Sequence, residues 1–135
     1  MVIGRGSTLA IAREAALKLK ETANLHAEGY SGAEFRHGPM ALIATNYPIL
    51  MFMPTDAAAD TLVALAADLR RNHAAVFSVE PGAGEGRLAA LPPDQPETDA
   101  VCQIQSFYAA AVRLAKLRGV DADNPRHLNK VTRTR

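Results

Sequence analysis

Three charged residues near the start of the chain are spaced as they would be on one face of a helix. Glu14, Lys18 and Glu21 are separated by four and three residues, so their side chains would follow one another along the helix surface. A carboxylate can accept a proton from a substrate, and a neighbouring ammonium group can stabilise the resulting negative charge. The same spacing is common on helix faces that contact only water, and taken alone it favours that interpretation.

The segment after this helix carries more reactive side chains than a simple connection needs. It contains His26 and Glu28, followed by Glu-Phe-Arg-His-Gly-Pro at residues 34–39. Connections between apolar elements frequently carry function when they hold such residues. This context favours a functional role for the charged face of the preceding helix.

The run Gly4-Arg5-Gly6-Ser7 begins like a dinucleotide-binding motif, but the third glycine is replaced by Leu9. The next strand follows only after about forty residues, too late to place an acidic residue on a ribose. A nicotinamide cofactor is therefore not expected. Backbone N–H groups at a helix start still favour a small anion or a sugar hydroxyl. Arg5 and Ser7 are the candidate binding residues there, and a plain tight turn is an equal alternative.

Metal and disulfide chemistry find little support in the sequence. The four histidines include no pair at metal-ligand spacing on a helix, so we expect no metal site. Cys102 is the only cysteine, which excludes an internal disulfide. The glycine-rich residues 82–86 lack the lysine and the serine or threonine of a phosphate loop, and a surface loop is expected there.

The composition is that of a globular domain. The 135 residues are 48% hydrophobic, and the net charge of +1 leaves no basic field for nucleic acid or an acidic membrane surface. The longest strongly apolar run, residues 49–53, is far too short to span a membrane, and the first residues lack the basic-then-apolar pattern expected of a signal peptide. We therefore expect one cytoplasmic domain over residues 1–135.

Apolar runs and helical spacing predict the elements that must position these residues. Strands are expected at 1–4, 49–53, 74–79 and 88–91, and helices at 8–25, 56–72 and 97–118, with a loop at 28–39. The last helix should bury Val101, Ile104, Tyr108, Ala111 and Ala115. The alternation predicts a three-layer α/β/α sandwich with a mostly parallel sheet, which binds ligands at the carboxyl ends of its strands.

Four motifs resemble a known family. They are Ala-Ala-Leu-Lys-Leu-Lys-Glu at 15–21, His-Ala-Glu at 26–28, the run at 34–39, and Asp-Asn-Pro-Arg-His-Leu-Asn-Lys at 123–130. On these residues the chain resembles the sugar isomerase (SIS) family, and within it the second SIS domain of glucosamine-6-phosphate synthases and of two-SIS glucosamine-6-phosphate deaminases. The resemblance covers nearly the whole chain. It implies a parallel five-stranded sheet and interconversion of fructose 6-phosphate with an amino-aldose phosphate, without metal or nucleotide cofactor.

The resemblance also implies roles for individual residues. Glu21 would be the base that moves a proton between C1 and C2, and Lys18 would hold the sugar and its enediol-type intermediate. His37 would open the sugar ring in the site of a neighbouring subunit, which implies a homodimer. In the C-terminal catalytic tail, residues 121–135, Lys130 would form a Schiff base with the open-chain ketose, and Asn129 beside it would bind substrate.

Two departures from the family limit what the chain can do alone. The Ser-x-Ser-Gly-x-Thr loop that grips the sugar phosphate is missing, so a first SIS domain would have to supply it. The glutaminase domain of the synthases is missing as well. Synthesis and deamination share the same sugar chemistry and both stay open. A non-catalytic module that binds a sugar phosphate, and a pure assembly domain, are the alternatives.

Overall fold

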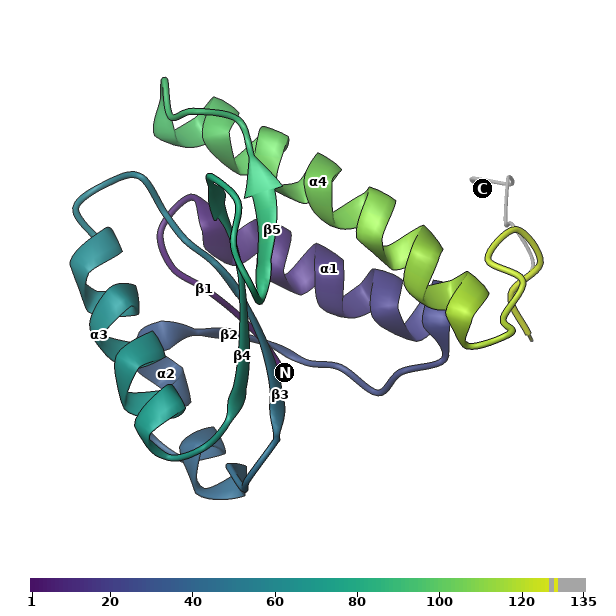
Figure 1. Ribbon diagram of the computed structural model, residues 1–135, viewed down its shortest axis with the longest axis horizontal. Helices are drawn as coiled ribbons and strands as arrows, with labels where there is room; N and C mark the ends of the chain where they lie inside the picture. The colour runs from purple at the N-terminus through teal and green to yellow at the C-terminus, as the bar shows by residue number, and fades with distance from the viewer. Residues whose placement is uncertain (127, 129–135) are drawn as a thin grey trace, which may run out of the picture.

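The computed structural model describes residues 1–126 and residue 128. Five parallel strands form one sheet in the order β2-β1-β3-β4-β5 (Figure 1). The strands are β1 (Val2–Gly4), β2 (Gly29–Ser31), β3 (Pro48–Phe52), β4 (Ala75–Pro81) and β5 (Arg87–Ala90). This confirms the predicted α/β class, and every strand pair is parallel.

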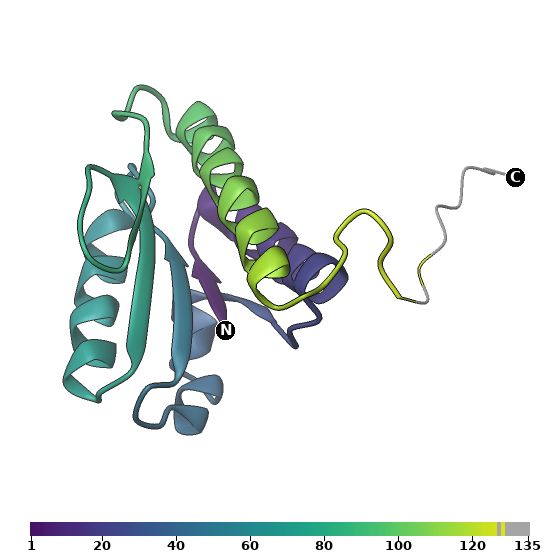
Figure 2. The same cartoon turned by 45° about the vertical axis from the view of Figure 1, so that its right-hand side comes forward.

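Helices cover both faces of the sheet and make three layers (Figures 1 and 2). On one face lie α1 (Thr8–Ala23) and α4 (Pro96–Leu117); on the other lie α2 (Gly32–Phe35) and α3 (Ala59–Arg71), with a 3₁₀ turn, η1 (Pro39–Leu42), nearby. Successive strand residues point to opposite faces. Val2 accordingly packs into the core under α1 and α4, and Ile3 packs into the core under α3. No helix of the described residues is long and apolar enough to cross a membrane.

Small residues allow α1 to pack close to the sheet. Ala12, Ala15 and Ala16 are buried on its inner face. A Cβ atom on Gly4 would lie 2.7 Å from the backbone carbon of Thr8, and one on Gly29 would lie 2.8 Å from Cα of Arg13. The Thr8 hydroxyl then ties the helix to the neighbouring strand, because it donates to the carbonyl oxygen of Phe52 at 3.0 Å. The start of α1 is thus fixed relative to β1, β2 and β3.

The prediction of a loop at residues 28–39 was wrong, because this segment forms β2, α2 and the start of η1. Three residues are too few to show strand periodicity, and β2 exists through its pairing with β1, where Tyr30 lies opposite Ile3. The Ser31 hydroxyl and the Glu34 carboxylate then cap α2 at its N-terminus. The first helix also ends earlier than predicted, at Ala23, because Asn24 adopts a left-handed conformation with φ of 50°.

The predicted core stripe of the last helix was partly wrong. Val101 and Tyr108 are 62% and 40% exposed, whereas Gln103 and Phe107 are buried. Phe107 packs edge-on against Phe52, and the Gln103 side chain donates to the carbonyl oxygen of Met53 at 2.7 Å. The helix is therefore rotated so that a polar side chain satisfies the end of β3, and Tyr108 turns toward α1.

Candidate active site

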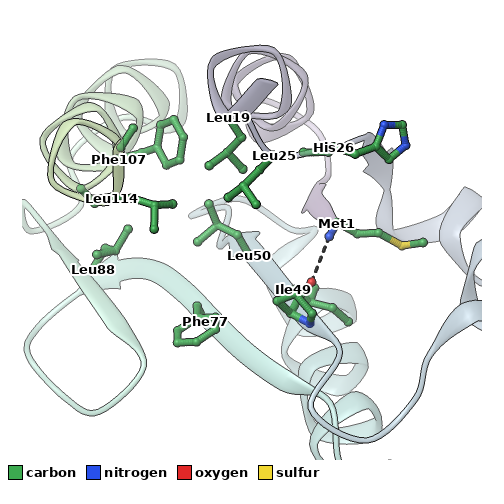
Figure 3. Close-up of a pocket in the computed structure, with 14 residues that line it drawn as sticks. Met1, Leu19, Leu25, His26, Ile49, Leu50, Phe77, Leu88, Phe107 and Leu114 are labelled. Atoms are coloured by element: carbon green, nitrogen blue, oxygen red, sulfur yellow. Dashed lines mark hydrogen bonds between the residues drawn. The ribbon is translucent and has the colours of Figure 1, made fainter. Parts of the chain in front are cut away.

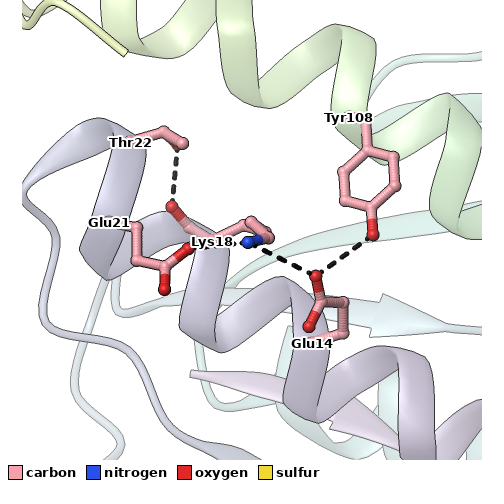
Figure 4. Close-up of polar contacts among 5 residues, drawn as sticks. All are labelled: Glu14, Lys18, Glu21, Thr22 and Tyr108. Atoms are coloured by element: carbon pink, nitrogen blue, oxygen red, sulfur yellow. Dashed lines mark hydrogen bonds and ion pairs between the residues drawn. The ribbon is translucent and has the colours of Figure 1, made fainter. Parts of the chain in front are cut away.

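Lys18 and Glu21 form a direct ion pair on α1 (Figure 4). The Lys18 ammonium group donates to Oε2 of Glu21 at 2.7 Å, and it lies 3.7 Å from Oε1 of Glu14 one turn earlier. The spacing predicted from the sequence therefore produces one continuous cluster of two carboxylates around one cation. The cluster is built on a helix, which holds its members in fixed relation.

A fourth side chain joins this cluster from α4. The hydroxyl group of Tyr108 donates to Oε1 of Glu14 at 3.1 Å (Figure 4). The sequence prediction missed this contact because it placed Tyr108 in the core. Only its hydroxyl group, which usually finds a polar partner, hinted at another position. The contact links α1 to α4 at the level of the charged residues.

The side chains of the cluster are accessible to a ligand. Those of Glu14, Lys18 and Glu21 are 36%, 33% and 29% exposed. The hydrogen bond to Glu21, helped by the charge of Glu14, raises the pKa of Lys18 above its ordinary value. Lys18 therefore stays a cation at neutral pH, suited to hold an oxyanion and unsuited to act as a neutral amine. Burial and the charge of Glu14 also raise the pKa of Tyr108, which keeps that hydroxyl a donor.

Arg5, Ser7 and His37 do not join this cluster. Thr8 and Glu21 stand near opposite ends of α1, and thirteen residues at about 1.5 Å each separate them by about 20 Å along the helix axis. Arg5 and His37 instead line a shared depression of about 380 Å³ on the other side of the sheet, beside α2 and α3. The Ser7 hydroxyl lies at the start of α1, buried and without a hydrogen-bond partner among the described residues.

Asn129 and Lys130 lie outside the described residues. Of the residues singled out from the sequence, the structure thus brings Lys18 and Glu21 together. It brings Arg5 and His37 together at a second place. The two places are too far apart for one hexose phosphate to contact both within one chain.

An apolar pocket of about 400 Å³, which the sequence did not reveal, opens at the amino ends of the strands (Figure 3). Its walls come from the sheet and from the inner sides of α1 and α4, and include Leu19, Leu25, Leu50, Phe77, Leu88 and Leu114. The N-terminal amine donates to the carbonyl oxygen of Pro48 at its rim. Such walls offer few groups for sugar chemistry, so the pocket is not the candidate active site.

Comparison with known proteins identifies the family. The model of the SIS domain matches residues 1–80, which is more than half of the chain. The chain belongs to the SIS domain family. The matched residues contain β1, β2, β3, α1 and nearly all of β4. The Lys18–Glu21 pair lies inside the matched residues.

Curated relatives of this SIS domain are named as glutamine–fructose-6-phosphate aminotransferases (isomerizing). One from Thermococcus kodakarensis is 34% identical over 132 residues, covering 95% of this chain and 22% of the relative. Another, from Sphingobium yanoikuyae, is 33% identical and is covered over 88% of its length. The chain thus spans about a fifth of the length of the longer relatives that it matches.

Among solved structures, glucosamine-6-phosphate deaminase from Thermotoga maritima superimposes with a TM-score of 0.75 and 26% identity, over 95% of this chain and 38% of that chain. The C-terminal domain of glucosamine-fructose-6-phosphate aminotransferase from Francisella tularensis gives a TM-score of 0.71 and 27% identity, over 91% and 36% of the two chains. The SIS domain is therefore similar to members of both enzyme groups.

Proposed function

We propose that this SIS domain supplies the proton-transfer half of an enzyme that interconverts fructose 6-phosphate and glucosamine 6-phosphate. The enzyme would be either a glutamine–fructose-6-phosphate aminotransferase or a glucosamine-6-phosphate deaminase. The observation that carries the proposal is the Lys18–Glu21 pair, 2.7 Å apart and partly exposed on α1. The names of the curated relatives and of the solved deaminase support the substrate class.

The residue types fit the chemistry of aldose–ketose isomerisation. Glu21 would remove the proton from the carbon next to the sugar carbonyl and return it to the neighbouring carbon. Lys18 would stabilise the negative charge that develops on the oxygen. The substrate oxygen would replace Glu21 as the ion-pair partner of Lys18. Glu14, which accepts a hydrogen bond from Tyr108, would keep the ammonium group in place.

The remaining groups of such a site would come from elsewhere in the assembly. A first SIS domain would hold the sugar phosphate, and His37 would act in the site of a second subunit of a homodimer. The separation of about 20 Å between the two ends of α1 agrees with a site in which His37 and Glu21 come from different subunits. By the resemblance, Lys130 would be the amine that condenses with the ketose and Asn129 a substrate ligand.

The test is Glu21→Gln in the assembled enzyme. This substitution keeps the size and hydrogen-bonding capacity of the side chain but removes its basicity, so exchange of the C1 proton of fructose 6-phosphate with D₂O should slow by about 100-fold or more. Glu85→Gln, in the exposed loop after β4, is the matched control and should leave the exchange rate unchanged. A Glu21→Gln rate within a few-fold of the wild-type rate would contradict the assignment.

A second candidate function is a non-catalytic module that binds a sugar phosphate. The depression lined by Arg5 and His37, remote from Glu21, favours it. The two candidates differ in one result. A binding module would keep its ligand and its regulatory effect after Glu21→Gln, and the parent enzyme would lose no turnover.

A further inference from the structure

The depression beside α2 and α3, which we call the Arg5 depression, brings three basic side chains together. It is lined by Arg5, Gly32, Ala33, Arg36, His37, Thr61, Leu62 and Ala64. Arg5 follows the carboxyl end of β1, while Arg36 and His37 follow α2, which begins at the carboxyl end of β2. This is the edge at which open parallel sheets bind their ligands.

The charges around the Arg5 depression are not balanced. Arg36 contacts Asp68 at 3.0 Å, and Asp68 is also paired with Arg71. Among the described residues, neither Arg5 nor His37 has an acidic partner within ion-pair distance. One permanent cation and one titratable group are therefore left to face a ligand. A guanidinium group matches phosphate oxygens in geometry, with two parallel hydrogen bonds.

The walls of the Arg5 depression limit what it can hold. A volume of about 380 Å³ is at the lower end of small-molecule sites, enough for a phosphate group and a short polyol. Gly32 packs directly against Leu62, so a Cβ atom at this position would collide with the leucine side chain. The remaining wall is aliphatic apart from Thr61, whose hydroxyl already donates to the carbonyl oxygen of Ala58 at 2.7 Å. The polar contacts thus come from the basic side chains.

We propose that the Arg5 depression binds the phosphate group of a small phosphorylated metabolite, at a site separate from the Lys18–Glu21 cluster of the same chain. Phosphate is the ligand chemistry that the basic side chains fit. That the metabolite is a sugar phosphate rests on the proposed function, whereas binding of phosphate itself does not. Glu21 of the same chain lies about 20 Å away along α1, so this chain's own base would not reach a sugar phosphate bound here.

The experiment is a titration of the ¹⁵N-labelled chain with inorganic phosphate, followed by amide chemical shifts at constant ionic strength. Shifts should concentrate at residues 5–7, 32–37 and 61–64, with a Kd on the order of 1 mM. Arg5→Gln removes a charge-assisted contact and should raise this Kd about tenfold. Arg70→Gln, an equal charge change on α3 away from the depression, should leave it within twofold. Arg5→Lys should recover part of the affinity.

Further titrations show which part of the ligand causes the chemical-shift changes. Fructose 6-phosphate should shift the same amides as phosphate, and fructose should shift none of them. Glu21→Gln should bind phosphate like the wild type, so failure of the proposed function leaves this result intact. The proposal is overturned if chloride at equal ionic strength produces the same shifts. It is also overturned if Arg5→Gln, with an otherwise unchanged spectrum, binds phosphate as the wild type does.

Discussion

Glu14 connects two helices at the level of single residues. Its carboxylate lies 3.7 Å from the Lys18 ammonium group and accepts a hydrogen bond from Tyr108 on α4. Lys18 therefore has carboxylates on both sides and would keep one of them if a ligand displaced the other. The hydrogen bond from Tyr108 limits the movement of the Glu14 carboxylate toward Lys18. The cluster is thus an arrangement of four groups, although only Lys18 and Glu21 are assigned to the chemistry.

The ionisation of Tyr108 should report on Glu14. Burial and the negative charge of Glu14 raise the pKa of Tyr108 above its ordinary value. Because tyrosine becomes an anion when it loses its proton, Glu14→Gln should lower the pKa of Tyr108 toward 10. Absorbance at the tyrosinate band, titrated in both proteins with Tyr108→Phe to assign the step, measures this shift. Glu34→Gln, away from the cluster, should not move the step; equal pKa values in wild type and Glu14→Gln would refute the contact.

At the scale of elements, α1 is the part of the fold that positions the candidate site. Buried alanines and two glycines beneath it let the helix approach β1 and β2. Close packing fixes the position of Thr8 at the start of α1. Because the helix is rigid, the position of Glu21 in its last turn is then fixed as well. A shift of α1 relative to the sheet would therefore move Lys18 and Glu21 as well.

Gly4→Ala should disturb the packing of α1 against β1. The added Cβ atom would lie 2.7 Å from the backbone carbon of Thr8, and backbone atoms cannot move aside as a side chain can. The free energy of unfolding, measured by urea denaturation, should fall by about 1–3 kcal/mol. Gly84→Ala is the matched control, since its Cβ atom would meet only the flexible end of the Arg87 side chain, 3.2 Å away. Equal stability of Gly4→Ala and wild type would show that α1 is seated less tightly than the structure indicates.

At the scale of the whole molecule, the outer face of α1 and α4 is more apolar than a solvated surface requires. Leu17 and Val112 are 42% and 60% exposed. They lie one turn beyond Glu14 and Tyr108, whose hydrogen bond joins the two helices. A contiguous group of large exposed apolar side chains is typical of an interface. We expect this face, together with the side of the sheet that carries His37, to contribute to the proposed homodimer.

Val112→Arg should weaken that dimer. An arginine buried without a partner costs several kcal/mol, so the dissociation constant should rise by about 100-fold or more. Sedimentation velocity over a range of concentrations measures it. Leu91→Arg places the same charge just after β5, at the edge of the sheet opposite β2, and should leave association unchanged. Loss of association in Leu91→Arg alone would move the interface to the β5 edge of the sheet.

The sequence alone determined the α/β class, the principal helices and the adjacency of Lys18 and Glu21. Each of these depends on residues a few positions apart, because helix spacing and apolar runs are local properties of the chain. The four motifs, read as residue types in order, also indicated the SIS family. The roles of Lys18 and Glu21 in the chemistry stay predictions.

Only the tertiary structure decided which distant residues meet. β2 forms because β1 offers it a partner, and β5 runs parallel to β4 although only five residues join them. Tyr108 reaches Glu14 because α4 packs beside α1, and Arg5 and His37 line one depression because β1 and β2 end at the same edge. These contacts join residues far apart along the chain. They are set by how helices and strands pack against one another, which no short stretch of sequence contains.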